Sequence, residues 1–113
     1  MTLAQTYSWI FYAIGLASND GPAKHGAIEQ VADGINHAVP TQKEIRSSIS
    51  WLASEGLVQK EGRGYALSES GKTLFESLSE QVGTTMGVWE KLEKHVAMKG
   101  VDNTNAVNPA TLT

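Results

Sequence analysis

The apolar positions of this chain follow a helical spacing over most of its length. In the first segment, from about Thr6 to Ser18, they occur all round the helical wheel and include the aromatic residues Tyr7, Trp9 and Tyr12. A helix that is apolar on every side is normally buried on more than one side. We therefore expect one face to pack on the core and another on a later helix or on a partner subunit.

A second, shorter helix is expected from about Gly26 to Asn36. Its apolar residues recur at spacings of three and four, which places them in a single stripe. They are Ile28, Val31, Ala32 and Ile35.

The third helix, from about Gln42 to Ser54, has the clearest start signal in the chain. Thr41 and Glu44 have the T-x-x-E spacing of a capping box, in which each side chain bonds the backbone amide of the other residue. The helical period predicts an inner face made of Ile45, Ile49, Leu52 and Ala53. It predicts a short-chained, mildly basic outer face made of Lys43, Ser47, Ser50 and Ser54, flanked by Arg46.

A small β-hairpin is expected next. Leu57 to Lys60 and Tyr65 to Leu67 read as two short strands, and "EGRG" between them supplies the glycines that a tight turn needs. Ser68 is a candidate N-cap for the helix that follows.

The C-terminal part carries more apolar residues than one small core needs. From Phe75 to Val96 they recur every three or four residues. Gly83 and Gly87 would either divide this segment into two helices or allow a close contact with another helix. Packing against the first helix, within the chain or across a two-fold axis, would cover these residues and the first helix together. We predict a homodimer, with an interface made of Trp9, Tyr12, Met86, Trp89, Leu92 and Val96.

The length of the chain limits the number of domains that it can form. The chain has 113 residues, the size of one compact domain. We expect a folded unit over 1–80, a C-terminal helix over 81–99 and a frayed tail over 100–113.

The formal net charge is −3, yet the stretch from Thr41 to Gly64 holds four basic and three acidic residues. The acidity therefore lies mostly outside that stretch.

The sequence carries no signal for export, membrane insertion, metal binding or catalysis. The chain has no cysteine, its longest apolar run is far shorter than the roughly 20 residues that span a bilayer, and no basic leader precedes that run. A cytoplasmic protein without a membrane segment is expected. His25, Glu29 and His37 lack the spacing of a zinc site. No serine lies in G-x-S-x-G and no phosphate-binding loop is present, so we predict neither metal, cofactor nor catalysis.

One long segment, "PTQKEIRSSISWLASEGLVQKEGRGYALSESGKTLFESL", resembles the core of a winged helix-turn-helix domain. The likeness is to bacterial transcriptional regulators of the multiple-antibiotic-resistance repressor and phenolic-acid repressor types. It rests on the "GLV" turn after a capped helix and on the Y-x-L-[ST]-x-x-G junction formed by Tyr65, Leu67, Ser68 and Gly71. The resemblance implies a mainly α fold with a small β-hairpin (α+β), namely a three-helix core, a two-stranded wing and one or more C-terminal helices.

The resemblance also implies a function. The third helix would enter the major groove of double-stranded DNA, and the wing would lie along the backbone or the minor groove. Glu44 and Glu61 are expected close to this surface. A protein-interaction module that binds a polypeptide with the same elements is the alternative, and the aromatic cluster leaves a small-molecule effector open. The residues that would contact DNA are Gln42, Lys43, Arg46, Ser47, Ser50, Lys60 and Arg63.

Overall fold

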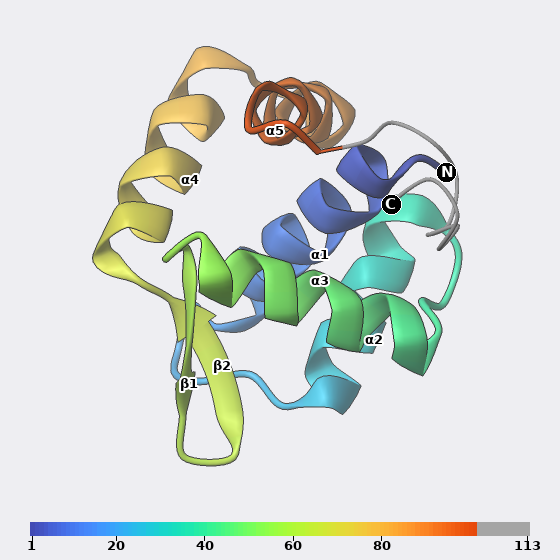
Figure 1. Cartoon of the computed structure of the whole chain (residues 1–113), viewed down its shortest axis with the longest axis vertical. Helices are drawn as coiled ribbons and strands as arrows, with labels where there is room; N and C mark the ends of the chain where they lie inside the picture. Colours follow the sequence, from blue (N-terminus) through green and yellow to red (C-terminus); the bar gives the residue numbers. More distant parts are fainter. Residues whose placement is uncertain (102–113) are drawn as a thin grey trace.

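The first helix, α1 (Leu3–Ala17), runs through the middle of the molecule, and the other elements are arranged round it (Figure 1). The structure is a computed structural model, and it describes residues 1–101. In this part the chain is mainly helical, with five helices and one two-stranded antiparallel sheet. The other elements are α2 (His25–Asn36), α3 (Gln42–Ser54), β1 (Val58–Glu61), β2 (Gly64–Leu67), α4 (Glu69–Gln81) and α5 (Thr85–Met98).

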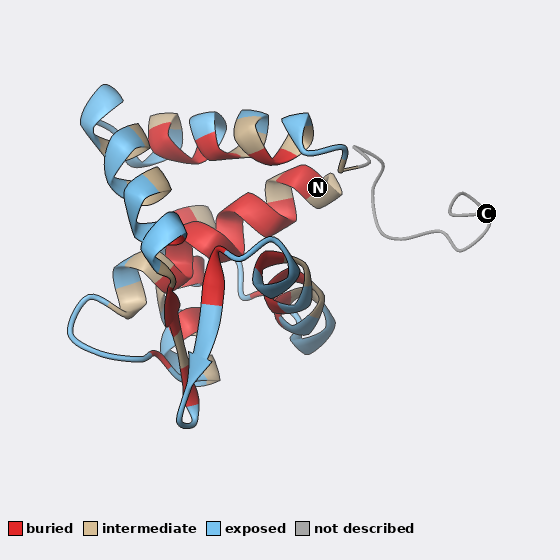
Figure 2. Cartoon of the chain, turned by 60° about the vertical axis from the view of Figure 1, so that its left-hand side comes forward, coloured by how far each residue is buried: buried red, intermediate tan, exposed pale blue. Residues whose placement is uncertain are grey.

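Helix α1 is buried on all sides, as its sequence predicts. Every residue from Thr6 to Ile14 is buried, and the buried surfaces of the other elements turn toward this helix (Figure 2). The helix begins one turn earlier than the apolar pattern indicates. Thr2 caps it, because its hydroxyl accepts from the Gln5 amide at 3.1 Å while the Gln5 side chain accepts from the Thr2 amide at 2.8 Å.

Helix α5 packs on α1 within the same chain. The indole nitrogen of Trp89 donates to the carbonyl of Gln5 and to the hydroxyl of Ser8, both at 3.1 Å. Trp9 donates to the carbonyl of Ala32 on α2 at 2.9 Å, so two indoles tie α1 to helices on opposite sides. Of the six residues that the sequence assigns to a dimer interface, five are thus buried within one chain, and Met86 is the one that stays exposed.

Helix α3 has the predicted limits, and its capping box is confirmed. The Thr41 hydroxyl accepts from the Glu44 amide at 3.0 Å, and the Glu44 carboxylate accepts from the Thr41 amide at 2.8 Å. One inner position was predicted wrongly: Ala53 is exposed, whereas Ser48 is fully buried. At 100° per residue the buried stripe is centred near Leu52, and Ala53 lies about 90° from that centre. The buried residues are Ile45, Ser48, Ile49 and Leu52.

The hairpin is joined to the core from two directions. Val58 pairs with Leu67 and Glu61 with Gly64, so each strand extends one residue closer to the turn than predicted. Gly62 at the tip has φ 61°, a left-handed conformation that glycine adopts without strain. On the other side of β2, Tyr65 forms an isolated antiparallel bridge with Ala23 in the α1–α2 loop.

The start of α4 is held against the hairpin by Ser68 and Gly71. The Ser68 hydroxyl accepts from the Gly71 amide at 3.0 Å and donates to the carbonyl of Gly56. A side chain on Gly71 would overlap the carbonyl oxygen of Leu57. Both residues are therefore needed for the close approach that the Y-x-L-[ST]-x-x-G pattern places here.

The C-terminal stripe divides between two helices, with Gly83 in the break and Gly87 inside the second helix. Helix α4 ends at Gln81, and Thr84 caps α5 by accepting from the Gly87 amide at 3.1 Å. The predicted frayed tail lies outside the described residues from 102 onward.

Candidate nucleic-acid interface

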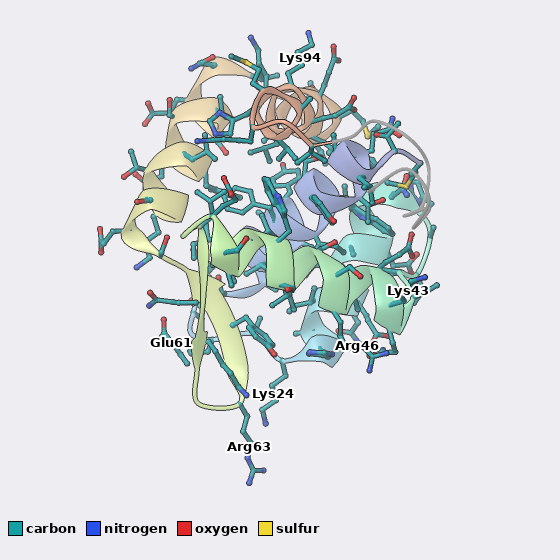
Figure 3. The ribbon with its side chains drawn as sticks, viewed as in Figure 1. Lys24, Lys43, Arg46, Glu61, Arg63 and Lys94 are labelled. Atoms are coloured by element: carbon teal, nitrogen blue, oxygen red, sulfur yellow. The ribbon has the colours of Figure 1, made fainter. Side chains whose placement is uncertain are left out.

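The outer face of α3 is polar and exposed along its length. Lys43, Arg46 and Ser50 are exposed, and Ser47 is half-buried beside them. Because the apolar stripe of α3 is held against α1, these side chains point away from the core. Lys43 and Arg46 lie on the lower right of the molecule in Figure 3.

The hairpin carries Arg63 farthest from the core. Arg63 follows Gly62 at the tip, and its side chain extends past the end of the molecule (Figure 3). Lys60 pairs with Tyr65 in the sheet, and residues directly opposite in antiparallel strands point to the same face. That face turns toward the start of α2, since the ring of Tyr65 lies 5.7 Å from the ring of His25.

Lys24 also lies on this surface, although it is not among the residues that the sequence predicts to contact DNA. Ala23 and Tyr65 exchange two backbone hydrogen bonds, each of 2.8 Å, and these bonds place the next residue, Lys24, beside the hairpin. Its side chain is exposed and points toward the same end of the molecule as Arg63 (Figure 3). A single bridging residue has no periodicity, so no sequence pattern marks it.

The two acidic residues expected near this surface are both directed elsewhere. Glu44 is engaged in the capping box with Thr41. Glu61 pairs with Gly64, which places it on the face of the hairpin opposite Lys60. Its carboxylate accepts from Gln59 at 2.9 Å, and in Figure 3 it lies on the other side of the hairpin from Lys24 and Arg46.

Gln42, which the sequence predicts to contact DNA, forms a hydrogen bond within the protein. The Gln42 amide nitrogen donates to the carboxylate of Glu29 on α2 at 2.9 Å. This bond fixes α2 to the first turn of α3, and it brings an acidic side chain to the edge of the surface. Gln42 would have to exchange this bond for a base in order to read DNA.

Within the described part of the chain, the basic side chains of α3, of the hairpin and of Lys24 form no ion pair. Within residues 1–101 the one ion pair joins Glu90 and Lys94 on α5, at 3.5 Å, at the far end of the molecule (Figure 3). Cations that are not neutralised by carboxylates are available for phosphate oxygens. We call the five of them the basic end: Lys24, Lys43, Arg46, Lys60 and Arg63.

The remaining chemistry of the described chain is sparse. No three His, Asp or Glu side chains among residues 1–101 converge as metal ligands would. None of the helices in that part has both the length and the apolar character needed to cross a membrane. Burial raises the pKa of Tyr7, whose ring stacks on Trp51 at 5.1 Å, so this tyrosine acts as a core residue.

Comparisons with protein-family models, with curated proteins and with solved structures found no match to this chain.

Proposed function

We propose that this protein is a winged helix-turn-helix regulator of transcription that binds double-stranded DNA. In this proposal α3 enters the major groove and the β1–β2 hairpin is a wing that lies along the backbone or the minor groove. The observation that carries it is the basic end. Five exposed cations from three separate segments lie on the same part of a chain whose net charge is −3, and none of them forms an ion pair within residues 1–101.

Some of these side chains would position the protein on the DNA backbone, and others would contact base edges. Arg46 has the planar fork that binds guanine or phosphate in a bidentate way, and Ser47 and Ser50 would bond phosphates or base edges. Lys24, Lys60 and Arg63 would contact phosphates on either side of the groove. Most of the affinity would then be electrostatic and would fall as salt is added.

A dimer would strengthen this binding, because two copies double the number of phosphate contacts. Of the residues that the sequence assigns to the interface, Met86 is 60% exposed. We therefore keep the homodimer as part of the proposal, with Met86 as its surface residue.

A protein-interaction module is the second candidate, and one exposed side chain favours it. Val39, in the loop before α3, is 63% exposed and would suit an apolar contact with a polypeptide. The basic end would then bind an acidic segment of that partner.

A gel-shift assay on a mixture of genomic fragments separates the two candidates. The DNA proposal expects shifted fragments at low salt, and a large loss of binding in the double variant Arg46→Ala/Arg63→Ala. Lys94→Ala, a cation removed at the far end, is the matched control and should bind as the wild type does. No shift at low salt, or equal binding by the double variant, would refute the DNA proposal and leave the interaction module.

A further inference from the structure

A hollow of about 470 Å³ lies behind the hairpin, away from Lys60. It is bounded by the end of α1, the α1–α2 loop, the hairpin and α4. Its volume falls within the range of about 300 to 1,000 Å³ that small-molecule sites occupy. The DNA proposal makes no use of it.

Part of the lining of the hollow is apolar and packed on the core. The ring of Phe75 packs against that of Tyr12, with centroids 5.7 Å apart. Phe75 also lies directly on Gly15, where any side chain would overlap the ring. Leu67 and Ala66 complete this apolar part of the lining.

The rim of the hollow is charged and acidic on balance. Glu61 at the end of β1 and Glu76 on α4 contribute carboxylates from two different elements, and Lys72 contributes one ammonium group. Within residues 1–101 none of the three forms an ion pair. Their charges are therefore not neutralised by one another, and the Glu61 carboxylate accepts one hydrogen bond, from Gln59.

We propose that this hollow binds a small cationic molecule whose ammonium group is attached to a flat apolar body. The body would lie on Phe75, and the ammonium group would be held between Glu61 and Glu76. A cation near a ring face also gains from the ring quadrupole. An anion is disfavoured, because two carboxylates outnumber the one ammonium group of Lys72.

Titration followed by ¹H–¹⁵N NMR tests this proposal on the protein without DNA, so the result does not depend on the function proposed above. The probe is 2-phenylethylammonium, and its neutral and anionic analogues are 2-phenylethanol and 3-phenylpropanoate. The cation should shift the amide signals of Gly15, Gly21 and Glu61 in a saturable way, with a Kd of about 1 mM. The two analogues should bind several times more weakly.

Charge-changing variants give the decisive comparison. Glu61→Gln/Glu76→Gln should weaken binding of the cation about fivefold, whereas Lys72→Gln should strengthen it slightly. Glu80→Gln, on the same helix but outside the hollow, is the matched control and should leave the Kd unchanged. All four side chains are exposed, so folding should be retained. No saturable shift at the hollow, or an unchanged Kd in the Glu61→Gln/Glu76→Gln variant, overturns the proposal.

Discussion

Ala23 and Tyr65 exchange both of their backbone hydrogen bonds, each at 2.8 Å, and so fix the α1–α2 loop against the hairpin. Gly64 permits this approach, because a side chain there would meet the backbone of Pro22 and Ala23 at 3.0 to 3.1 Å. The bridge has a consequence for function. It places Lys24 beside the hairpin, and a cation from the loop thereby points toward the same end of the molecule as Arg63 (Figure 3).

Replacing Lys24 should therefore weaken DNA binding even though this residue lies outside α3 and the hairpin. We expect Lys24→Ala to lower the affinity for a short duplex about three- to tenfold at moderate salt, by losing about one phosphate contact. Fluorescence anisotropy with a labelled duplex measures this. Lys94→Ala is the control, and equal affinities of the two variants would remove Lys24 from the interface.

The buried hydroxyl of Ser48 should cost stability. Its Oγ has no hydrogen-bond partner among residues 1–101. Ser8, also fully buried, donates to the Ala4 carbonyl at 2.6 Å and accepts from Trp89. An unsatisfied buried polar group costs about 1 to 3 kcal/mol. Ser48→Ala should thus raise the free energy of unfolding by about 1 kcal/mol, and Ser8→Ala should lower it by a similar amount.

Urea unfolding of these two variants measures the difference directly. Both replace a serine on a helix by alanine, so the change in helix propensity is the same. Changes of the same sign in the two variants would contradict the assignment of Ser48 as unsatisfied.

Gly71 is required where α4 meets the hairpin. Gly71→Ala would push a methyl group into the carbonyl of Leu57, and overpacking against backbone is poorly relieved. We expect the free energy of unfolding to fall by about 2 to 3 kcal/mol. Gly83→Ala, where a side chain would meet open space, should change it by less than about 0.5 kcal/mol. Similar losses in both variants, measured by thermal unfolding, would contradict this reading of the junction.

The dimer can be tested apart from the core. Trp89 is 8% exposed and donates two hydrogen bonds, so Trp89→Ala should destabilise the chain itself by about 3 to 5 kcal/mol. Met86→Glu changes an exposed side chain. It should leave the free energy of unfolding nearly unchanged while separating the two copies of the proposed dimer. Light scattering of the wild-type protein at tens of micromolar tests the homodimer. A monomer at that concentration would exclude it.

The sequence predicted those features that depend on local signals. The limits of α3 follow from the capping box of Thr41 and Glu44, and the turn of the hairpin follows from its glycines. It failed where the outcome depends on contacts between distant segments. Lys24 joins the basic end through one bridge at Ala23. Whether Ser48 or Ala53 is buried depends on where α3 meets α1.

The charge pattern was also only partly readable from the sequence. The sequence indicates that the acidity lies mostly outside the stretch from Thr41 to Gly64, but it does not indicate where Glu61, inside that stretch, points. Strand register decides that, because Glu61 pairs with Gly64 and Lys60 with Tyr65. The same alternation separates the basic end from the acidic rim of the hollow.

The most direct test of the central claim is the salt dependence of DNA binding. With five cations contributing, log K should fall with log salt at a slope of about −4 for each bound subunit. Arg46→Ala/Arg63→Ala should reduce the magnitude of that slope by about 2, and Lys94→Ala should leave it unchanged. A wild-type protein that binds no duplex even at low salt, or a slope that is the same in all three proteins, would contradict the claim that the basic end binds DNA.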